Sequence, residues 1–495
     1  MHRAAALSLV AACWLAACTR TPESFDLVLK SGRVVDPETG LDAVRDVGIR
    51  GDTIARISLE PLAGSRTIDA RGLVVAPGFI DLHQHQHDPA SYRLKAFDGL
   101  TTALELETGV PDVTRFIDAR RGKTLIHFGA TASHEAARVA AWDMPLLPSP
   151  MGPDAAIPDP PAGPSTNEPA TDERLNRILA LLRAQLDAGA LGVGVGLEYT
   201  PGATRHEVVE VFRLAATYGR PVFIHVRGAG RTEPGSSVES IVEVVGAAAV
   251  TGAAVHIVHV NSSCLRDAPE CLAMIEGARS RSLDVTVEAY PYGVGATFVN
   301  SAFFNPGWRE RRGIDFNDLE LPESGERLTE ERFDTLHASS NPQVVLIHNI
   351  PDEVVDSVIS HPLVMIASDG MREHPRGAAT FARVLARYVR AHKRLSLLEA
   401  VKKMSLLPAQ RLERATGDAH RKGRLQEGAD ADIVVFNPEQ VEDRATFRTP
   451  TEPSVGVRYL IVAGTLVVDD GRLVKGPAPG RPLTAHRNSR LMRAR

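Results

Sequence analysis

The chain has 495 residues, of which 43% are hydrophobic, a share that is typical of globular proteins and argues against long disordered stretches. Its 56 Lys and Arg residues nearly balance 61 Asp and Glu residues, for a net charge of −5. This balance provides no basic field to hold a nucleic acid and no acidic tail to recruit a basic partner. The length suggests about three domains, or one large barrel with a smaller domain.

Residues 1–17 have the pattern of a signal peptide. A basic segment with Arg3 precedes an apolar run over 4–15, which is too short for a permanent membrane helix. The run ends in Leu-Ala-Ala-Cys at Cys18, which resembles a bacterial lipobox. We expect a periplasmic lipoprotein anchored through Cys18; an ordinary signal peptide with a chance cysteine is the alternative. After export, Cys264 and Cys271 either form a disulfide or remain two free thiols.

Both ends of the mature chain predict short β-strands. Residues 26–57 alternate apolar runs with Gly-containing turns, and the same pattern returns at 431–436 and 459–474. Strands at opposite ends of one chain predict a small β-sandwich built from residues 18–76 and 417–480. The segment 77–416 must then leave this domain and return to it as a unit. Residues 481–495 are expected to form a disordered tail.

The segment 77–416 alternates apolar strands with amphipathic helices, which predicts a parallel sheet covered on both faces. About eight such units fit an α/β fold of the (β/α)8 TIM-like barrel type with insertions. A doubly wound sheet is the alternative, but no Gly-rich dinucleotide turn follows the first strand. The strand candidates are 78–83, 99–107, 124–130, 190–197, 221–226, 254–260, 283–291, 344–349 and 363–369.

Two stretches of this segment are expected to be insertions. Residues 145–169 are rich in proline and predict neither strand nor helix, whereas 300–341 carry aromatic side chains and mixed charges. Loops of this length in a compact domain are lids or binding loops, or else they are disordered.

Histidine and aspartate side chains stand at the ends of several predicted strands. His83 and His85 are two residues apart on an extended strand, so their side chains share one side. His225 and His259 end two later strands, and Asp369 ends another. One buried histidine is usually a hydrogen-bonded core group, but barrel active sites are built from strand carboxyl ends. Because several separate strands end in a histidine or an aspartate, and neutral imidazole is a common zinc ligand, the sequence predicts a metal site at these strand ends.

Several long motifs resemble the amidohydrolase superfamily and, within it, the N-acyl-D-amino-acid deacylase (D-aminoacylase) family. They are PGFIDLHQH, GALGVGVGLEYTPG, HPRGAATFARVLARYV, LSLLEAVKKMSLLPAQRL and GRLQEGADADIVVF, and the resemblance covers nearly all of the mature chain. It implies that His83 and His85 hold one metal position, while His225 and His259 hold a second, better-occupied zinc position. It also implies that Asp369 holds the hydrolytic water and passes its proton to the leaving amine.

The resemblance further implies how a substrate carboxylate is bound. Arg376, in the HPR motif, matches the arginine that grips this carboxylate through paired hydrogen bonds. Tyr292 matches a carboxylate-binding tyrosine, with Tyr290 as the alternative if the register differs by two residues. Asn261 stands where the deacylases place a lysine, so one cation of the set is missing. Glu198 is expected near the barrel mouth, as either a specificity residue or a surface glutamate.

The metal ligands depart from the family pattern at the second strand. The deacylases place a cysteine ligand there, and Thr108 occupies its position. We expect Glu107 to replace this ligand, with Glu105 on the same strand face as the alternative; both glutamates being merely salt-bridged or solvated is the third possibility. No lysine lies between Lys123 and Lys393, so a carboxylated lysine cannot bridge metals there. A carboxylate ligand would admit Mn²⁺, Co²⁺ or Fe²⁺ as well as Zn²⁺.

The expected function is metal-dependent hydrolysis of a linear amide in a small molecule, with deacylation of N-acyl-D-amino acids as the leading interpretation. Zinc would activate water, and an amine leaves only when protonated, so a carboxylate must act as base and then as acid. The alternatives are a hydrolase of the same fold acting on dipeptides, cyclic amides or lactones, and a non-catalytic envelope lipoprotein that keeps the barrel as a binding body.

Overall fold

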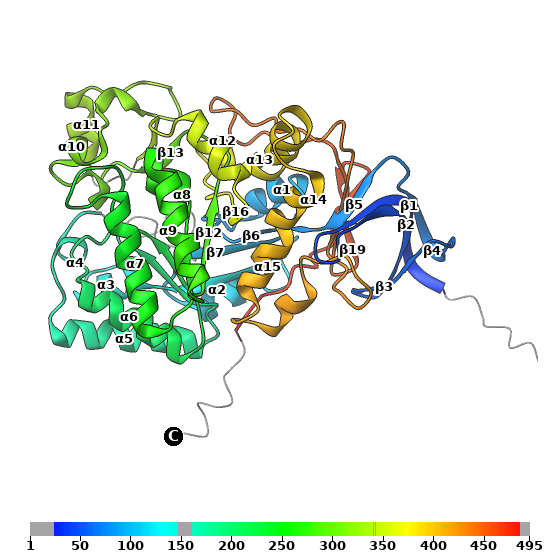
Figure 1. Ribbon diagram of the computed structural model, residues 1–495, viewed down its shortest axis with the longest axis horizontal. Coiled ribbons are helices and arrows are strands. Elements are labelled where there is room, and N and C mark those ends of the chain that lie inside the picture. The colour runs from blue at the N-terminus through cyan, green and yellow to red at the C-terminus, as the bar shows by residue number, and fades with distance from the viewer. Residues whose placement is uncertain (1–23, 147–160, 340, 342, 486–495) are drawn as a thin grey trace, which may run out of the picture.

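The structure is a computed structural model that describes residues 24–146, 161–339, 341 and 343–485. It shows a helix-covered barrel with a β-domain at one end, where the first and last strands of the chain lie together (Figure 1). The predicted signal peptide and Cys18 lie outside the described residues. Within the described part of the chain, no helix is both long and apolar enough to cross a membrane.

Eight parallel strands form the predicted barrel, in the sheet order β16, β12, β11, β10, β9, β8, β7 and β6. A parallel bridge between Gln84 and Gly370 connects the segments that follow the two outermost strands, β6 and β16, so the sheet is nearly closed. The strands are β6 (Phe79–Asp81), β7 (Leu100–Val110), β8 (His127–Ser133), β9 (Val193–Gly196), β10 (Val222–His225), β11 (Val255–Ile257), β12 (Val285–Ala289) and β16 (Val364–Ile366).

Helices between these strands cover the barrel. Many begin at a side-chain cap: Thr171 accepts the Arg174 N–H at the start of α5, and Ser236 accepts the Glu239 N–H at the start of α7. The larger helices are α1 (Pro89–Phe97), α2 (Val113–Arg120), α3 (His134–Ala141), α5 (Asp172–Asp187), α6 (Arg205–Thr217), α7 (Ser237–Thr251), α9 (Ala268–Ser280), α12 (Asp352–Ser360) and α13 (Arg376–Arg383).

Shorter helical segments complete the barrel layer. A disulfide between Cys264 and Cys271 joins α8 (Val260–Cys264) to α9, which decides between the two states predicted for these cysteines. After α13, the chain forms a π-helical stretch (Val384–Ala391), α14 (Leu397–Val401), a second π-helical stretch (Lys402–Leu406) and α15 (Leu407–Leu412) before it returns to the β-domain.

The predicted strand at 344–349 is not part of the barrel. It forms β15 (Val344–Ile347), which pairs antiparallel with β13 (Gly295–Phe298) and β14 (Leu319–Glu320). A four-residue apolar strand has the same sequence pattern in either sheet, so periodicity could not separate the two cases. These strands, together with α10 (Trp308–Arg312) and α11 (Glu330–His337), form a subdomain that we call the cap.

The predicted insertion at 300–341 is therefore folded over its described residues. The cap has its own aromatic core, in which Trp308 and Phe333 pack with ring centroids 5.3 Å apart. In Figure 1, α10 and α11 lie at the end of the molecule opposite strands β1 to β4. The cap therefore stands at the barrel end that is far from the β-domain.

Strands from both ends of the chain form one β-domain, as predicted, and they are hydrogen-bonded as a single nine-stranded sheet. One face encloses a core that includes Leu29, Ile49 and Ile433. Val74 and Phe436 belong to the core shared with the barrel. The strands are β1 (Ser24–Asp36), β2 (Leu41–Arg50), β3 (Thr53–Ser58), β4 (Ala63–Asp69), β5 (Val74–Pro77), β17 (Ile433–Phe436), β18 (Val457–Val462), β19 (Thr465–Asp469) and β20 (Arg472–Leu473).

Two short segments differ from prediction. Residues 481–485, expected to begin a disordered tail, bind the barrel: Leu483 is 2% exposed, and its N–H donates to the Phe128 carbonyl at 2.7 Å. This segment is held by hydrogen bonds of its backbone. Because backbone hydrogen bonds do not require particular side chains, no pattern in the sequence marks them. In the Pro-rich insertion, α4 (Pro164–Asn167) forms where no helix was expected, because the Thr166 hydroxyl and the Gly163 backbone bond to each other.

Candidate metal centre

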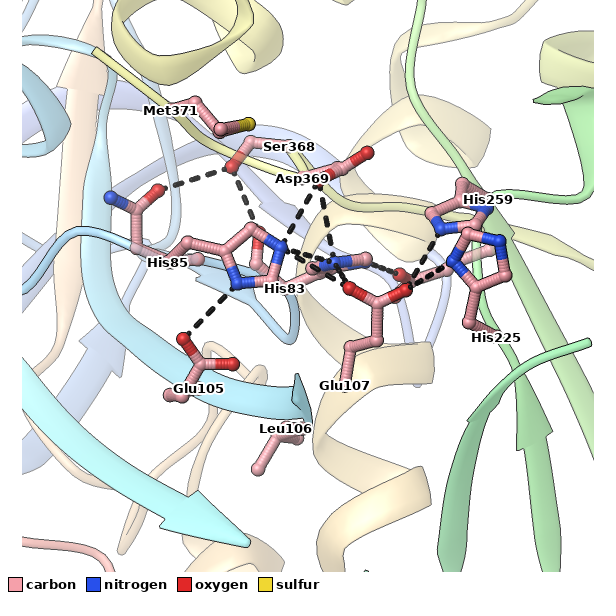
Figure 2. Close-up of polar contacts among 12 residues, drawn as sticks. His83, His85, Glu105, Leu106, Glu107, His225, His259, Ser368, Asp369 and Met371 are labelled. Carbon is pink, nitrogen blue, oxygen red and sulfur yellow. Dashed lines mark hydrogen bonds and ion pairs between the residues drawn. The ribbon is translucent and has the colours of Figure 1, made fainter. Parts of the chain in front are cut away.

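The six predicted metal-ligand residues converge at the carboxyl ends of β6, β7, β10, β11 and β16. Figure 2 shows the Glu107 carboxylate at the centre of this cluster, between two pairs of imidazole rings. His83 Nε2 and His85 Nε2 lie 2.8 and 3.2 Å from Glu107 Oε2. His225 Nδ1 and His259 Nε2 each lie 2.9 Å from Glu107 Oε1. Each oxygen of one carboxylate therefore faces a different histidine pair.

Asp369 stands beside the first pair. Its Oδ1 is 3.2 Å from His85 Nε2 and 3.5 Å from His83 Nε2, and its Oδ2 is 2.8 Å from Arg376 Nη2. The carboxylate thus faces the cluster with one oxygen and a guanidinium with the other. All six residues are buried, and their candidate ligand atoms lie within 4.8 Å of one another in two groups: His83, His85, Glu107 and Asp369; and Glu107, His225 and His259.

Carboxylates outside the cluster orient the first histidine pair. His83 Nδ1 donates to Glu288 Oε1 at 2.7 Å, and His85 Nδ1 donates to Glu105 Oε2 at 3.1 Å. The Nε2 atom of His256 lies 3.0 Å from the other oxygen of Glu288. These bonds turn both Nε2 atoms inward, where they lie 3.1 Å apart. Two ring nitrogens directed at one point beside carboxylates fit a divalent cation.

The second pair is oriented in the same way. His259 Nδ1 lies 3.1 Å from the Ser263 hydroxyl and 3.0 Å from the Ser262 hydroxyl. His225 Nε2 lies 2.8 Å from Glu198 Oε2, so its Nδ1 is left facing Glu107. Every imidazole of the cluster therefore has a polar partner on its outer nitrogen, which is the usual arrangement around metal-binding histidines.

The backbone turns sharply at two of these residues. Asp369 has φ of 49° and His259 has φ of 30°, both in the left-handed region that non-glycine residues rarely adopt. Such conformations cost about 1–3 kcal/mol each and concentrate at functional sites. On β7, by contrast, the ordinary alternation of side chains directs Glu105 and Glu107 to the same side of the strand.

Electrostatics among the protein groups favour the charged forms of Asp369 and His83. Burial raises the pKa of Asp369, but Arg376 and His83 lower it more strongly, so the net pKa lies well below the usual range. Burial opposes the charged form of His83, yet Glu107 and Asp369 raise its pKa to about 10. Protons and a metal ion would therefore compete for the same imidazole nitrogens.

A cavity of about 50 Å³ opens over the cluster, and only one of the two predicted tyrosines lines it. Tyr290 lines this cavity beside His259 and Asp369. Tyr292 does not: its hydroxyl lies 3.4 Å from the Ala379 carbonyl, in a buried setting. The structure therefore brings the alternative register, Tyr290, to the site and places Tyr292 away from it.

The other two predicted substrate-binding residues lie behind the cavity wall. Arg376 is 1% exposed and sits between Asp369 and the Tyr290 ring, with its guanidinium carbon 4.5 Å from the ring centroid. Its Nε and Nη1 atoms have no hydrogen-bond partner among the described residues. Asn261 is fully buried, does not line the cavity, and donates to the Tyr290 carbonyl at 3.1 Å. It therefore supports the position of Tyr290.

Sequence reasoning missed a contribution from the cap. Arg312, the last residue of α10, pairs with Glu198 at the wall of the cavity, and its guanidinium carbon lies 3.8 Å from the Phe303 ring centroid. Glu198 is thus a largely buried partner of His225, with a side chain that is 10% exposed, rather than a surface glutamate. The motif containing Glu198 was visible in the sequence, but nothing marked Arg312 among the many arginines of the insertion.

The barrel and its buried cluster of histidines and acids define a metal-binding (β/α)8-barrel enzyme. The amidohydrolase family model matches residues 66–197 and 269–468. An N-acyl-D-glutamate deacylase from Alcaligenes xylosoxydans xylosoxydans is 32% identical, over 90% of this chain and 94% of that protein. A D-aminoacylase from the same organism is 30% identical, over 90% and 95%.

Solved structures agree with these sequence matches. One is the crystal structure of N-acyl-D-glutamate deacylase from Bordetella bronchiseptica, complexed with zinc and a phosphonate inhibitor that mimics the tetrahedral intermediate of the reaction. It superposes with a TM-score of 0.77 at 27% identity, covering 94% of this chain and 100% of that chain. The chain belongs to the amidohydrolase family.

Proposed function

We propose that this enzyme removes the acyl group from N-acyl-D-amino acids by metal-dependent hydrolysis of the amide bond. The observation that carries the proposal is the shared Glu107 carboxylate between two histidine pairs, with Asp369 beside them at the cavity. Deacylases of this type at 32% and 30% identity support the reaction class and the substrate class.

The donor set fits zinc, because imidazole nitrogens and carboxylate oxygens are its usual ligands after thiolate. When bound, zinc lowers the pKa of water from 15.7 to about 7 and polarises a carbonyl group. The absence of a thiolate would also admit Mn²⁺, Co²⁺ or Fe²⁺. The proposed ligands are His83, His85 and Asp369 at the first position, His225 and His259 at the second, and Glu107 at both.

Asp369 is the proposed general base and acid. The carboxylate is ionised at neutral pH and its Oδ1 faces the cluster, so it can take a proton from the attacking water. It then gives that proton to the amide nitrogen, and the amine leaves as the carbon–nitrogen bond breaks. The Nη2 atom of Arg376 binds Asp369 Oδ2 at 2.8 Å, so the other carboxylate oxygen, Oδ1, faces the cluster.

Arg376 and Tyr290 are the proposed partners of the substrate carboxylate. Arg376 lies behind the cavity wall with two buried nitrogen atoms that have no hydrogen bond among the described residues, and a carboxylate that reached them would satisfy them. Burial raises the pKa of Tyr290 to about 12, so its hydroxyl stays protonated and can donate. Asn261, which replaces a lysine of the family pattern, lies behind Tyr290 and contributes no charge.

The direct test is an assay of purified protein reloaded with zinc. The panel contains N-acetyl-D-amino acids with acidic, apolar and basic side chains, their L-enantiomers, dipeptides and lactones. We expect amide cleavage with a preference for the D-series and loss of activity after chelation. Cleavage of dipeptides or lactones alone would contradict the proposed substrate class, and metal-independent activity would contradict the proposed chemistry.

We also propose that the enzyme is exported and tethered to a membrane through lipidated Cys18. The support is the lipobox-like sequence that precedes this residue. Cell fractionation of the wild type and Cys18→Ser tests the proposal: the wild type should be in the membrane fraction and the variant should not. A soluble wild-type protein would contradict it.

A further inference from the structure

Glu198 connects the metal centre to the cap. It follows β9 and is 10% exposed at its side chain, between an imidazole and a guanidinium. One oxygen, Oε2, lies 2.8 Å from His225 Nε2, and the other, Oε1, pairs with Arg312. A carboxylate in this position accepts the Nε2 proton, and the lone pair of His225 is then on Nδ1, which faces Glu107.

Arg312 is itself fixed by the cap. Its side chain is 6% exposed, and its guanidinium packs over the Phe303 ring. The preceding residues of α10 include Trp308, whose ring packs against Phe304 and Phe333 in the aromatic core of the cap. The orientation of the guanidinium therefore depends on the folded cap rather than on the barrel strands.

We propose that Glu198 and Arg312 are positioning residues for the second metal position: Glu198 holds His225, and Arg312 holds Glu198. The inference rests on the proposed function, in which the centre binds metal. It extends that function by making the cap a structural part of one metal position. Serine hydroxyls hold His259, and Glu288 holds His83. The orientation of these two histidines therefore does not depend on Glu198 or Arg312.

The proposal predicts a selective loss of metal affinity. Removal of an outer partner of a metal-binding histidine costs about 10- to 100-fold in affinity. Glu198→Ala should therefore weaken one of two zinc equivalents by about 10- to 100-fold and leave the other unchanged. Glu198→Gln keeps an acceptor oxygen for the His225 N–H and should recover most of the affinity. Arg312→Met keeps the packing on Phe303 but frees Glu198, and it should give an intermediate loss.

The experiment measures zinc bound per chain in chelator-buffered zinc solutions, for the wild type and for each variant. Arg309→Ala is the matched control, because Arg309 lies on the same helix but is 42% exposed and pairs with Asp315 at the surface. Its zinc titration should equal that of the wild type. Circular dichroism and the melting temperature of each chelated variant establish that the chain is folded before the titrations are compared.

The outcomes separate this inference from the proposed function. Wild-type affinity at both positions in a folded Glu198→Ala protein would overturn the inference, as would an equal loss at both positions. A wild-type protein that binds no second zinc would overturn the inference together with the two-metal assignment. If the wild type binds two zinc ions with the predicted variant pattern but cleaves no N-acyl-amino acid, the inference stands and the proposed substrate class fails.

Discussion

Replacement of Glu107 by glutamine should weaken both metal positions at once. The substitution keeps the size of the side chain and removes its charge, and each oxygen of Glu107 faces a different histidine pair at 2.8 to 3.2 Å. Loss of an outer partner alone costs about 10- to 100-fold in metal affinity. Loss of an anionic ligand should lower the metal affinity by more than the upper end of this range. A 100-fold loss of affinity corresponds to about 2.8 kcal/mol of binding free energy. We therefore expect the zinc affinity to fall by more than about 100-fold at each position.

Metal analysis after dialysis against buffered zinc measures this effect, and Glu105→Gln is the matched control. Glu105 lies on the same strand two residues earlier and contacts His85 Nδ1 at 3.1 Å, outside the cluster. Its substitution should therefore weaken only the position held by His83 and His85. If Glu107→Gln kept two zinc ions at wild-type affinity, or lost only one, the shared role of this carboxylate would be refuted.

Three further predictions concern catalysis, substrate binding and stability. Asp369→Asn should lower kcat by about 10²- to 10⁴-fold while zinc remains at the second position; stopped assays and metal analysis check this, and a near-normal kcat would exclude Asp369 as the base. Arg376→Ala should raise KM for N-acyl-amino acids by about 10- to 150-fold, the equivalent of a charged hydrogen bond of about 1.5–3 kcal/mol, and an unchanged KM would dismiss its role. Asp432→Asn should lower the melting temperature at pH 7, because a broken buried ion pair costs about 3–5 kcal/mol. Burial opposes ionisation of Asp432, but His127 and Lys422 lower its pKa well below the usual range. A carboxyl group with a lowered folded-state pKa stabilises the protein fully above about pH 5, and this contribution is lost as the pH falls below about 4. The difference in melting temperature between the wild type and Asp432→Asn should therefore become smaller in acid. A difference that stayed constant with pH would contradict a stabilising role for ionised Asp432.

Much of the architecture was predictable because each barrel strand is a short apolar run that ends in a recognisable turn. The spacing of His83 and His85, and the positions of His225, His259 and Asp369 at strand ends, identified the residues that converge in the structure. Glu107 could be selected because Thr108 is a poor ligand and its neighbour is anionic. Alternation along β7 then determines that Glu107, and not Thr108, faces the cluster.

The remaining features depend on contacts between distant segments, which local patterns do not encode. The strand at 344–349 is apolar enough for the barrel, yet it pairs with β13 and β14 in the cap. Tyr290 and Tyr292 differ by two residues, so only the path of the chain after β12 separates them. Arg312 is one of several arginines in a charged helix, and its pairing with Glu198 required the folded cap.

Diffraction data collected on both sides of the zinc absorption edge, from crystals grown with zinc, would show whether Glu107 lies between two metal ions. We predict two anomalous difference peaks, one on each side of the Glu107 carboxylate. The first should lie among His83, His85 and Asp369, and the second between His225 and His259. The absence of any peak in this cluster, or a single peak that Glu107 does not contact, would show that Glu107 is not a ligand shared by two metal positions.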